Sequence, residues 1–239
     1  MEDLAEVRVS GHTCGFTVGV DLGQRQDHTA IAVVEAQLRP RVAERQFEEH
    51  SVVRHLEKAS LGTDYVIVAR RLKAMATSLT ELAEAAGRRR RLHGLSGNGA
   101  SRISEPTFYV DVTGLGGPFC DFLHEENRGM KIVAVSITRG DQDHIWEGSG
   151  YRVLHVGKEA LIGRLQLLLG TGRIHLPESA AVDQLVEELR LYQARVSAGT
   201  GHISYGAQVG RHDDLVIATA LAVWERRRMQ PVRRPVQYA

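Results

Sequence analysis

The sequence is poor in the residues that hold disulfide scaffolds and zinc sites together. Its 239 residues include two cysteines, Cys14 and Cys120, and no CxxC pair. That number and spacing exclude a disulfide framework and a thiolate metal site. The eleven histidines show neither an HExxH nor an HxxxH spacing, so a zinc site built on histidines is not expected either.

Three longer signals are absent as well. No GxxxxGK[ST] loop occurs, so the chain has no ATPase motif of the P-loop type. No stretch approaches the roughly 18 apolar residues of a membrane span, and the N-terminal segment lacks the apolar run of a signal peptide. We therefore expect a cytosolic protein with no membrane partner.

Neither sign of charge is in clear excess. Thirty basic residues face 29 acidic ones, which gives a formal net charge of +1. A protein that binds nucleic acid through its overall charge is strongly basic, so any DNA-binding surface of this chain must be local. The basic residues considered for DNA contact are Arg25, Arg88, Arg89, Arg90, Lys158 and Arg211.

What the chain does have is enough length and apolar content for a full domain. With 239 residues, of which 43% are hydrophobic, it can form one α/β domain. We place this domain at residues 16–228, after a flexible N-terminus at 1–15 and before a basic C-terminal tail at 229–239.

The first part of the domain has the pattern of an antiparallel sheet followed by a long helix. Three runs rich in β-branched and apolar residues are separated by short polar turns, which favours a meander. Apolar residues at helical spacing follow and stop at Gly87, a residue type that commonly ends helices. The predicted elements are strands at 16–22, 29–35 and 41–53 and a helix at 65–86.

The second part contains a βαβ unit. A strand at 107–112, a glycine turn, a helix at 119–126 and a strand at 130–137 follow one another, so part of the sheet should be parallel. A polar loop is predicted at 139–150. The remaining predicted elements are helices at 158–169 and 180–189, a β-hairpin of 191–197 and 202–208, and a buried helix at 215–227.

Acidic residues stand at three of these element ends. Asp21 closes the first strand, Asp111 closes a later strand, and Asp213 and Asp214 open the last helix. Two hard cations a few ångströms apart must be fixed by carboxylates from several parts of a fold. Four neighbouring carboxylates cannot all stay ionised without cations. The pattern therefore predicts a site for two Mg²⁺ or Mn²⁺ ions that hydrolyses phosphodiesters.

Each acid also has a simpler explanation. Asp21 and Asp111 could belong to ordinary turns, and Asp213 or Asp214 could cap a helix. Capping alone does not explain two adjacent acids at the start of an almost wholly apolar helix. Asp27 could either reach the same metal cluster or only stabilise its turn. Which of Asp213 and Asp214 faces the metal stays open, because adjacent helix residues point about 100° apart.

Taken together, the motifs resemble the nuclease domain of tailed-bacteriophage terminase large subunits. They are GVDLGQRQDHTA at 19–30, VDVTG at 110–114 and HDDLV at 212–216 with the apolar helix after it. They occur in this order, and the resemblance covers about residues 16–224. That family has an RNase H-like fold, a mixed sheet with its first three strands antiparallel and later strands parallel, flanked by helices, with a β-hairpin near the active site.

The resemblance implies a metal-dependent endonuclease that cuts double-stranded DNA during viral genome packaging. It implies Asp21, Asp111 and Asp213 as the metal-binding triad, with Asp214 and Asp27 assisting. It also implies a packaging ATPase motor, a small terminase and a portal as partners, action in the cytoplasm of a bacterial host, and a monomer in isolation. Large terminases carry the motor N-terminal to the nuclease, so here the motor would be separately encoded, lost or removed.

Three other functions are considered. A structure-selective nuclease similar to Holliday-junction resolvases would share the fold and the acidic cluster, and it would be an obligate dimer. A non-catalytic packaging adaptor would keep the fold without the chemistry, and the presence of all the acids weighs against it. An actin-like or sugar-kinase half-domain would need a second phosphate loop that the sequence lacks.

Overall fold

The described part of the chain forms an eight-stranded mixed sheet with helices on both faces and a separate two-stranded hairpin. The computed structural model describes residues 12–23, 27–41, 46–92, 103–138, 144–147, 152–196, 203–207 and 212–224. The strands are β1 (His12–Asp21), β2 (Ala30–Arg41), β3 (Gln46–Lys58), β4 (Thr107–Asp111), β5 (Lys131–Thr138), β6 (His144–Glu147), β7 (Arg152–Gly157), β8 (Ile174–His175), β9 (Tyr192–Val196) and β10 (Ile203–Ala207). The helices are α1 (Tyr65–Leu92), α2 (Gly116–Glu126), α3 (Lys158–Gly170), α4 (Ala180–Leu191) and α5 (Asp214–Trp224).

The strand order in the large sheet is β6-β7-β5-β4-β1-β2-β3-β8. The pairs β1–β2 and β2–β3 are antiparallel, whereas β1–β4, β4–β5 and β5–β7 are parallel. The predicted fold class, with an antiparallel beginning and a parallel continuation, is confirmed. The predicted hairpin is confirmed as β9 and β10, which pair from Tyr192↔Ala207 to Val196↔Ile203.

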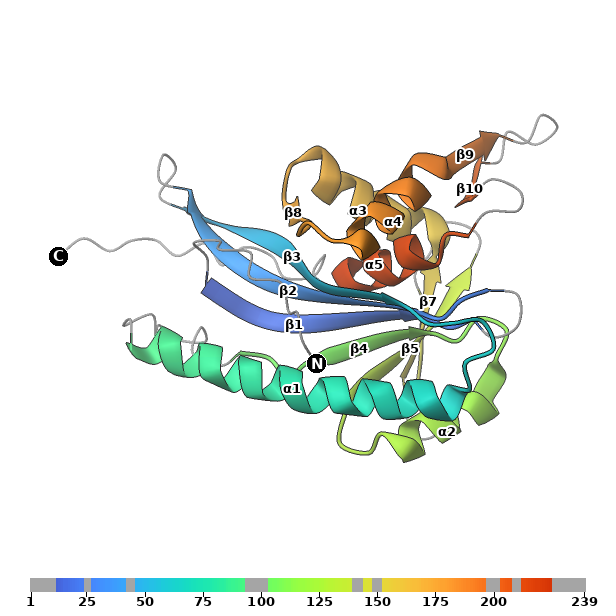
Figure 1. Cartoon of the computed structure of the whole chain (residues 1–239), viewed down its shortest axis with the longest axis horizontal. Helices are drawn as coiled ribbons and strands as arrows, with labels where there is room; N and C mark the ends of the chain where they lie inside the picture. Colours follow the sequence, from blue (N-terminus) through green and yellow to red (C-terminus); the bar gives the residue numbers. More distant parts are fainter. Residues whose placement is uncertain are drawn as a thin grey trace.

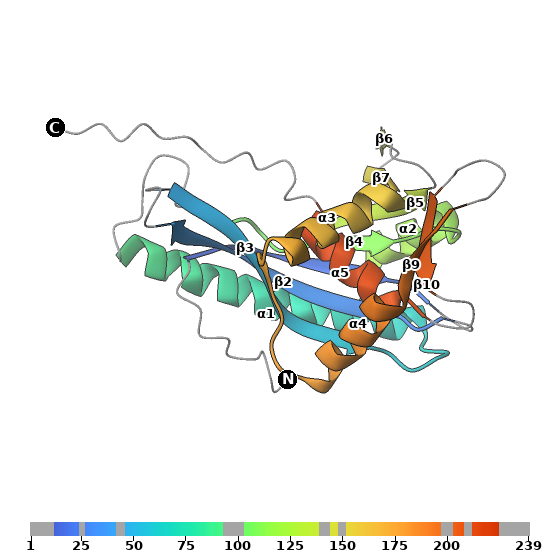
Figure 2. The ribbon, with the colours of Figure 1, turned by 90° about the horizontal axis from the view of Figure 1, so that it is seen from above.

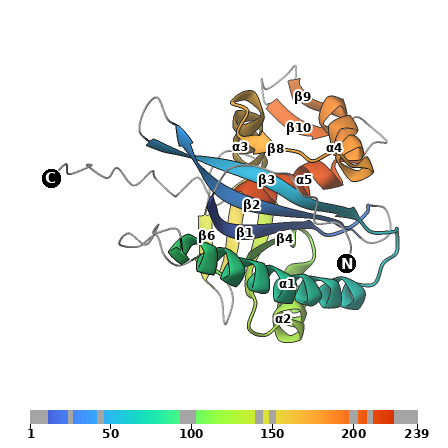
Figure 3. The same cartoon turned by 60° about the vertical axis from the view of Figure 1, so that its left-hand side comes forward.

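The helices form two layers, one on each face of the sheet (Figure 1). Figure 3 shows α1 and α2 on one side and α3, α4, α5 and the hairpin on the other. Figure 2 looks onto the second side, where α5 crosses the sheet beneath α3 and α4. Alternation along β1 explains the two cores: Phe16, Val18 and Val20 pack with α1, so residues 17, 19 and 21 face α5.

A glycine allows α5 to lie directly on β1. A Cβ atom at Gly19 would stand 1.9 Å from the carbonyl oxygen of Ala218 and 2.6 Å from the amide nitrogen of Ala222. Any larger side chain would therefore push the helix away from the strand. All the residues of α5 are buried, as predicted for the last helix.

The first helix is longer than predicted. It continues through Gly87 to Leu92, and Gly87 is buried inside it. Gly87 is not among the glycines with a positive φ, so it does not form the left-handed cap expected there. The arginines that follow are good helix formers, and cations are favoured near a helix C-terminus. Among the described helices, none is both long and apolar enough to cross a membrane.

Several strand and helix boundaries also differ from the prediction. The first strand begins at His12, and α2 begins at Gly116. A polar loop was predicted at 139–150, but the centre of this segment forms the short edge strand β6. The strand β7 was not predicted. Only pairing with β7 defines β6, and a four-residue edge strand has too little alternation to be recognised. The last residues of the helix predicted at 215–227 lie outside the described residues.

Candidate metal centre

Asp21 and Asp111 lie side by side at the ends of two parallel strands. The register of β1 and β4 pairs Val20 with Val110, and each aspartate is the next residue of its strand. Neighbouring strands run about 4.8 Å apart, so the two Cα atoms are separated by roughly that distance. Phe108 and Val110 pack towards α1, so Asp111 shares with Asp21 the face that α5 covers.

The two acids that open α5 each meet a lysine. Lys158, the first residue of α3, places its Nζ 3.1 Å from Asp213 Oδ2. Lys58, the last residue of β3, places its Nζ 3.0 Å from Asp214 Oδ2. Asp213 keeps a quarter of its side chain exposed, whereas Asp214 keeps only 5%. The adjacent acids therefore occupy different environments, one open and one enclosed.

Asp21 carries the clearest electrostatic sign of a cation site. Burial raises the pKa of the Asp21 carboxyl well above its usual range. The negative charges of Asp111, Asp214 and Asp213 raise this pKa further, and Lys158 partly offsets them. Within the part of the chain that the structure describes, no group donates a hydrogen bond to the Asp21 side chain. A proton or a cation from outside is needed to neutralise it.

Asp111 is fixed by the turn that follows its strand. Its Oδ1 accepts hydrogen bonds from the amide nitrogen of Thr113 (2.8 Å) and from Thr113 Oγ1 (2.5 Å). Thr113 Oγ1 in turn accepts a bond from the amide nitrogen of Ile137 (2.8 Å). Burial raises the pKa of Asp111, while the bonds from Thr113 and the charge of Lys158 lower it in part. Both bonds use Oδ1, so Oδ2 retains its lone pairs for a cation.

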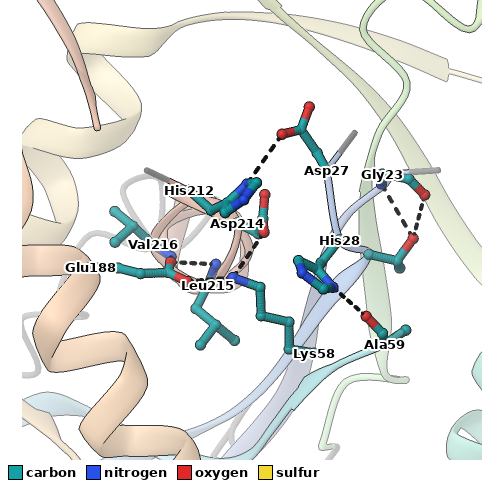
Figure 4. A network of polar contacts seen from close by, with 11 residues as sticks. Gly23, Asp27, His28, Lys58, Ala59, Glu188, His212, Asp214, Leu215 and Val216 are labelled. Atoms are coloured by element: carbon teal, nitrogen blue, oxygen red, sulfur yellow. Dashed lines mark hydrogen bonds and ion pairs between the residues drawn. The ribbon is translucent and has the colours of Figure 1, made fainter. Parts of the chain in front are cut away.

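Asp27 and His212 approach Asp214 from the open side (Figure 4). His212 Nδ1 lies 3.3 Å from Asp27 Oδ1, and ligand atoms of Asp27, His212 and Asp214 all lie within 4.8 Å of one another. The turn that carries Asp27 is closed by Thr29, whose Oγ1 donates to the carbonyl oxygen of Gly23 (2.8 Å). A Cβ at Gly23 would lie 2.2 Å from the carbonyl oxygen of Asp27, so this turn requires glycine.

The chemistry of the donor set suits a divalent cation. Asp214 Oδ2 is inaccessible to solvent and lies 3.0 Å from Lys58 Nζ, so this oxygen is matched to a cation of the fold itself. Carboxylate oxygens are the preferred ligands of Mg²⁺ and Mn²⁺, and imidazole nitrogen suits transition metals. The donor set of Asp21, Asp111, Asp213, Asp214, Asp27 and His212 fits such ions.

Three residues of this region were not singled out from the sequence. His212 adjoins the acidic pair, so its proximity to them in sequence was the available signal. Glu188 shares the buried face of α4 with Val182 and Leu185, and an acid on an apolar face is itself unusual. Lys58 has no local signal, because only tertiary packing brings the end of β3 to the start of α5.

The basic residues considered for DNA contact fall into separate places. Lys158 lies at the acidic cluster, and its Nζ stands 5.8 Å from the ring centroid of Tyr192, the first residue of the hairpin. Arg88 pairs with Glu84 near the far end of α1, roughly 35 Å along the helix from Tyr65, and Arg89 and Arg90 follow it. Arg25 and Arg211 lie outside the described residues.

Solved structures that are similar in fold include a large terminase nuclease. The large terminase nuclease from thermophilic phage G20c with bound magnesium superposes with a TM-score of 0.54 at 20% identity, over 91% of this chain and 83% of that one. Another structure of that nuclease gives 0.50 at 21% identity, over 90% and 82%. The human cytomegalovirus terminase nuclease domain, soaked with Mn, gives 0.48 at 13% identity, over 88% and 83%. No protein-family model and no curated protein matches the chain.

Proposed function

We propose that this chain is a divalent-metal-dependent nuclease that cuts double-stranded DNA in the manner of a terminase during viral genome packaging. One observation supports the proposal: the charges of Asp111, Asp214 and Asp213 all act on the carboxyl group of Asp21. Its pKa is raised by burial and by the other three acids. Such a cluster is stable at neutral pH only with cations bound. The shared fold with terminase nucleases adds support.

In this proposal Asp21 is the central ligand. It stands beside Asp111 on the neighbouring strand, and both face α5. Asp213 and Asp214 would complete the set from the helix, with Asp27 and His212 closing the open side. Two Mg²⁺ or Mn²⁺ ions bound here would supply Lewis-acid stabilisation of the phosphate and activation of the attacking water.

The chain's own residues would prepare the site for such a reaction. Thr113 fixes the orientation of Asp111 by holding one of its oxygens. Lys158 neutralises Asp213 in the free protein and is 31% exposed, so its ammonium group can turn to a DNA phosphate once another cation takes its place. The hairpin begins at Tyr192 next to Lys158, so it would border the path of the DNA.

The proposed partners follow from this role. The substrate is duplex DNA, approached through the site rather than through overall charge, since the net charge is +1. A separate packaging ATPase motor, a small terminase and a portal would supply translocation and docking. We expect the chain to act in the cytoplasm of a bacterial host. We also expect the isolated chain to be a monomer, and light scattering would measure this oligomeric state.

Plasmid cleavage tests the proposed function. The purified protein should nick and linearise supercoiled plasmid in the presence of Mn²⁺ or Mg²⁺, and EDTA should stop it. The matched control is Asp21→Asn, which removes the charge at the centre of the cluster and keeps its size. If folded protein leaves the plasmid supercoiled with both ions, the nuclease proposal is wrong and the packaging-adaptor alternative takes its place. Equal cutting by Asp21→Asn would point to a contaminating nuclease.

A further inference from the structure

The start of α5 is capped by a side chain from another helix. Glu188 of α4 accepts hydrogen bonds at Oε2 from the amide nitrogens of Leu215 (2.8 Å) and Val216 (3.2 Å). Figure 4 shows Glu188 reaching these two groups beside Lys58. Glu188 is 8% exposed, so these bonds form away from solvent. They satisfy two of the amide groups that a helix leaves unpaired at its beginning.

The residue that would ordinarily make those bonds is Asp213. Its carbonyl oxygen accepts the bond from the amide nitrogen of Ile217 (2.9 Å), which makes Asp213 the N-cap residue of α5. The side chain of an N-cap aspartate usually accepts from the second or third amide of the helix, here Leu215 or Val216. Because Glu188 already occupies both amides, the Asp213 carboxylate is turned to Lys158 and the acidic cluster instead.

The other oxygen of Glu188 extends this arrangement to Asp214. Glu188 Oε1 accepts a hydrogen bond from Lys58 Nζ (2.9 Å), and the same ammonium group lies 3.0 Å from Asp214 Oδ2. One buried carboxylate therefore joins β3, α4 and α5 at a single point. It holds the helix start while Lys58 fixes the second acid.

We propose that Glu188 is a positioning residue that replaces Asp213 as the cap of α5 and so leaves the Asp213 carboxylate available for metal. This inference rests on the proposed metal-dependent function. A second residue in this arrangement is Lys58, which Glu188 holds against Asp214. Residues that orient metal ligands from behind commonly change metal affinity or activity by 10–100-fold when they are removed.

The test compares Glu188→Ala and Glu188→Gln with Glu187→Ala as the control. Glu187 is the neighbouring residue on α4 and is 61% exposed, and among the described residues it pairs only with Arg190, so its removal should change little. Mn²⁺ affinity is measured by calorimetry at a temperature where circular dichroism shows each variant folded. We expect a loss of about 10–100-fold for Glu188→Ala and a smaller loss for Glu188→Gln, whose amide oxygen can still accept from the helix.

A crystal structure of metal-free Glu188→Ala decides the mechanism independently of catalysis. The Asp213 side chain should rotate away from Lys158 and accept from Leu215 or Val216. If Asp213 stays on Lys158, or if the folded variant binds Mn²⁺ as tightly as the unchanged protein, Glu188 only stabilises the fold and the inference is wrong. Failure of the unchanged protein to bind Mn²⁺ or cut DNA would instead contradict the proposed function, and the position of Asp213 would still decide the capping role.

Discussion

Two acids on the same sheet have opposite electrostatic surroundings. Glu35 of β2 is 4% exposed, and its Oε2 accepts from Arg54 Nε (2.7 Å) and lies 2.6 Å from Arg54 Nη2. Thr13 Oγ1 donates to its other oxygen at 2.5 Å. Asp21 of β1 is surrounded by like charges instead, and its pKa is raised. The Glu35 site is complete, because residues of the fold neutralise its charge, and its role is structural. The acidic cluster around Asp21 is incomplete, because like charges surround Asp21 and a cation from outside is needed to neutralise them.

Removing a member of the incomplete cluster should have the largest effect. Asp111→Asn takes away one charge and keeps the bonds to Thr113 through its amide oxygen. Ligand loss removes several kcal/mol of transition-state stabilisation, and about 4 kcal/mol corresponds to roughly 10³-fold in rate. Single-turnover cleavage of a labelled duplex measures this loss. A reduction of less than tenfold would show that Asp111 holds no essential metal.

Breaking the complete site should destabilise the fold without affecting metal binding. Arg54→Met leaves the carboxylate of Glu35 buried without its cation, which costs about 3 kcal/mol in comparable sites. Denaturant unfolding measures the free energy, and calorimetry should show unchanged Mn²⁺ affinity. The matched control is Arg88→Met, because its 3.7 Å contact with Glu84 is exposed and contributes little. A loss of Mn²⁺ binding in folded Arg54→Met would contradict the distinction between the two sites.

Added metal should stabilise the protein through the incomplete cluster. A ligand at 100 times its Kd raises the free energy of unfolding by about 2.7 kcal/mol, and each kcal/mol raises the Tm of a domain of this size by roughly 2–4 °C. Scanning calorimetry with Mn²⁺ should show this rise, and Asp21→Asn should largely lose it. An equal rise in Asp21→Asn would place the metal elsewhere.

The smallest expected effect is a pH dependence without metal. Because the pKa of Asp21 is raised on folding, the folded protein binds this proton more tightly than the unfolded chain does. Its contribution to stability is present below the unfolded value of about 4 and is lost as pH rises through the folded value. Relative to Asp21→Asn, the unchanged protein should therefore lose Tm as pH increases from about 4. A constant difference in Tm would contradict the raised pKa.

The sequence predicts most of the fold because its strongest patterns are local. The acids at the ends of β1 and β4 fall on one face because both strands alternate regularly, and the apolar α5 is recognisable on its own. The predicted end of α1 was wrong because Gly87 is tolerated inside a long packed helix. Short edge strands such as β6 depend on their neighbours for recognition.

The supporting residues of the candidate site were harder to predict than its acids. Lys58 and Glu188 are 130 positions apart in sequence, and only packing of α4 against α5 and the end of β3 brings them together. The sequence could not show that Glu188, rather than Asp213, caps α5, because Glu188 lies on another helix. Long-range contacts of this kind have no periodic signal.

A crystal of the protein soaked in Mn²⁺ and measured at the manganese absorption edge would locate the bound ions directly. We expect anomalous peaks within bonding distance of Asp21 and Asp111, shared with at least one carboxylate at the start of α5. The absence of any peak at these residues, with the ions bound elsewhere on the molecule, would contradict this expectation.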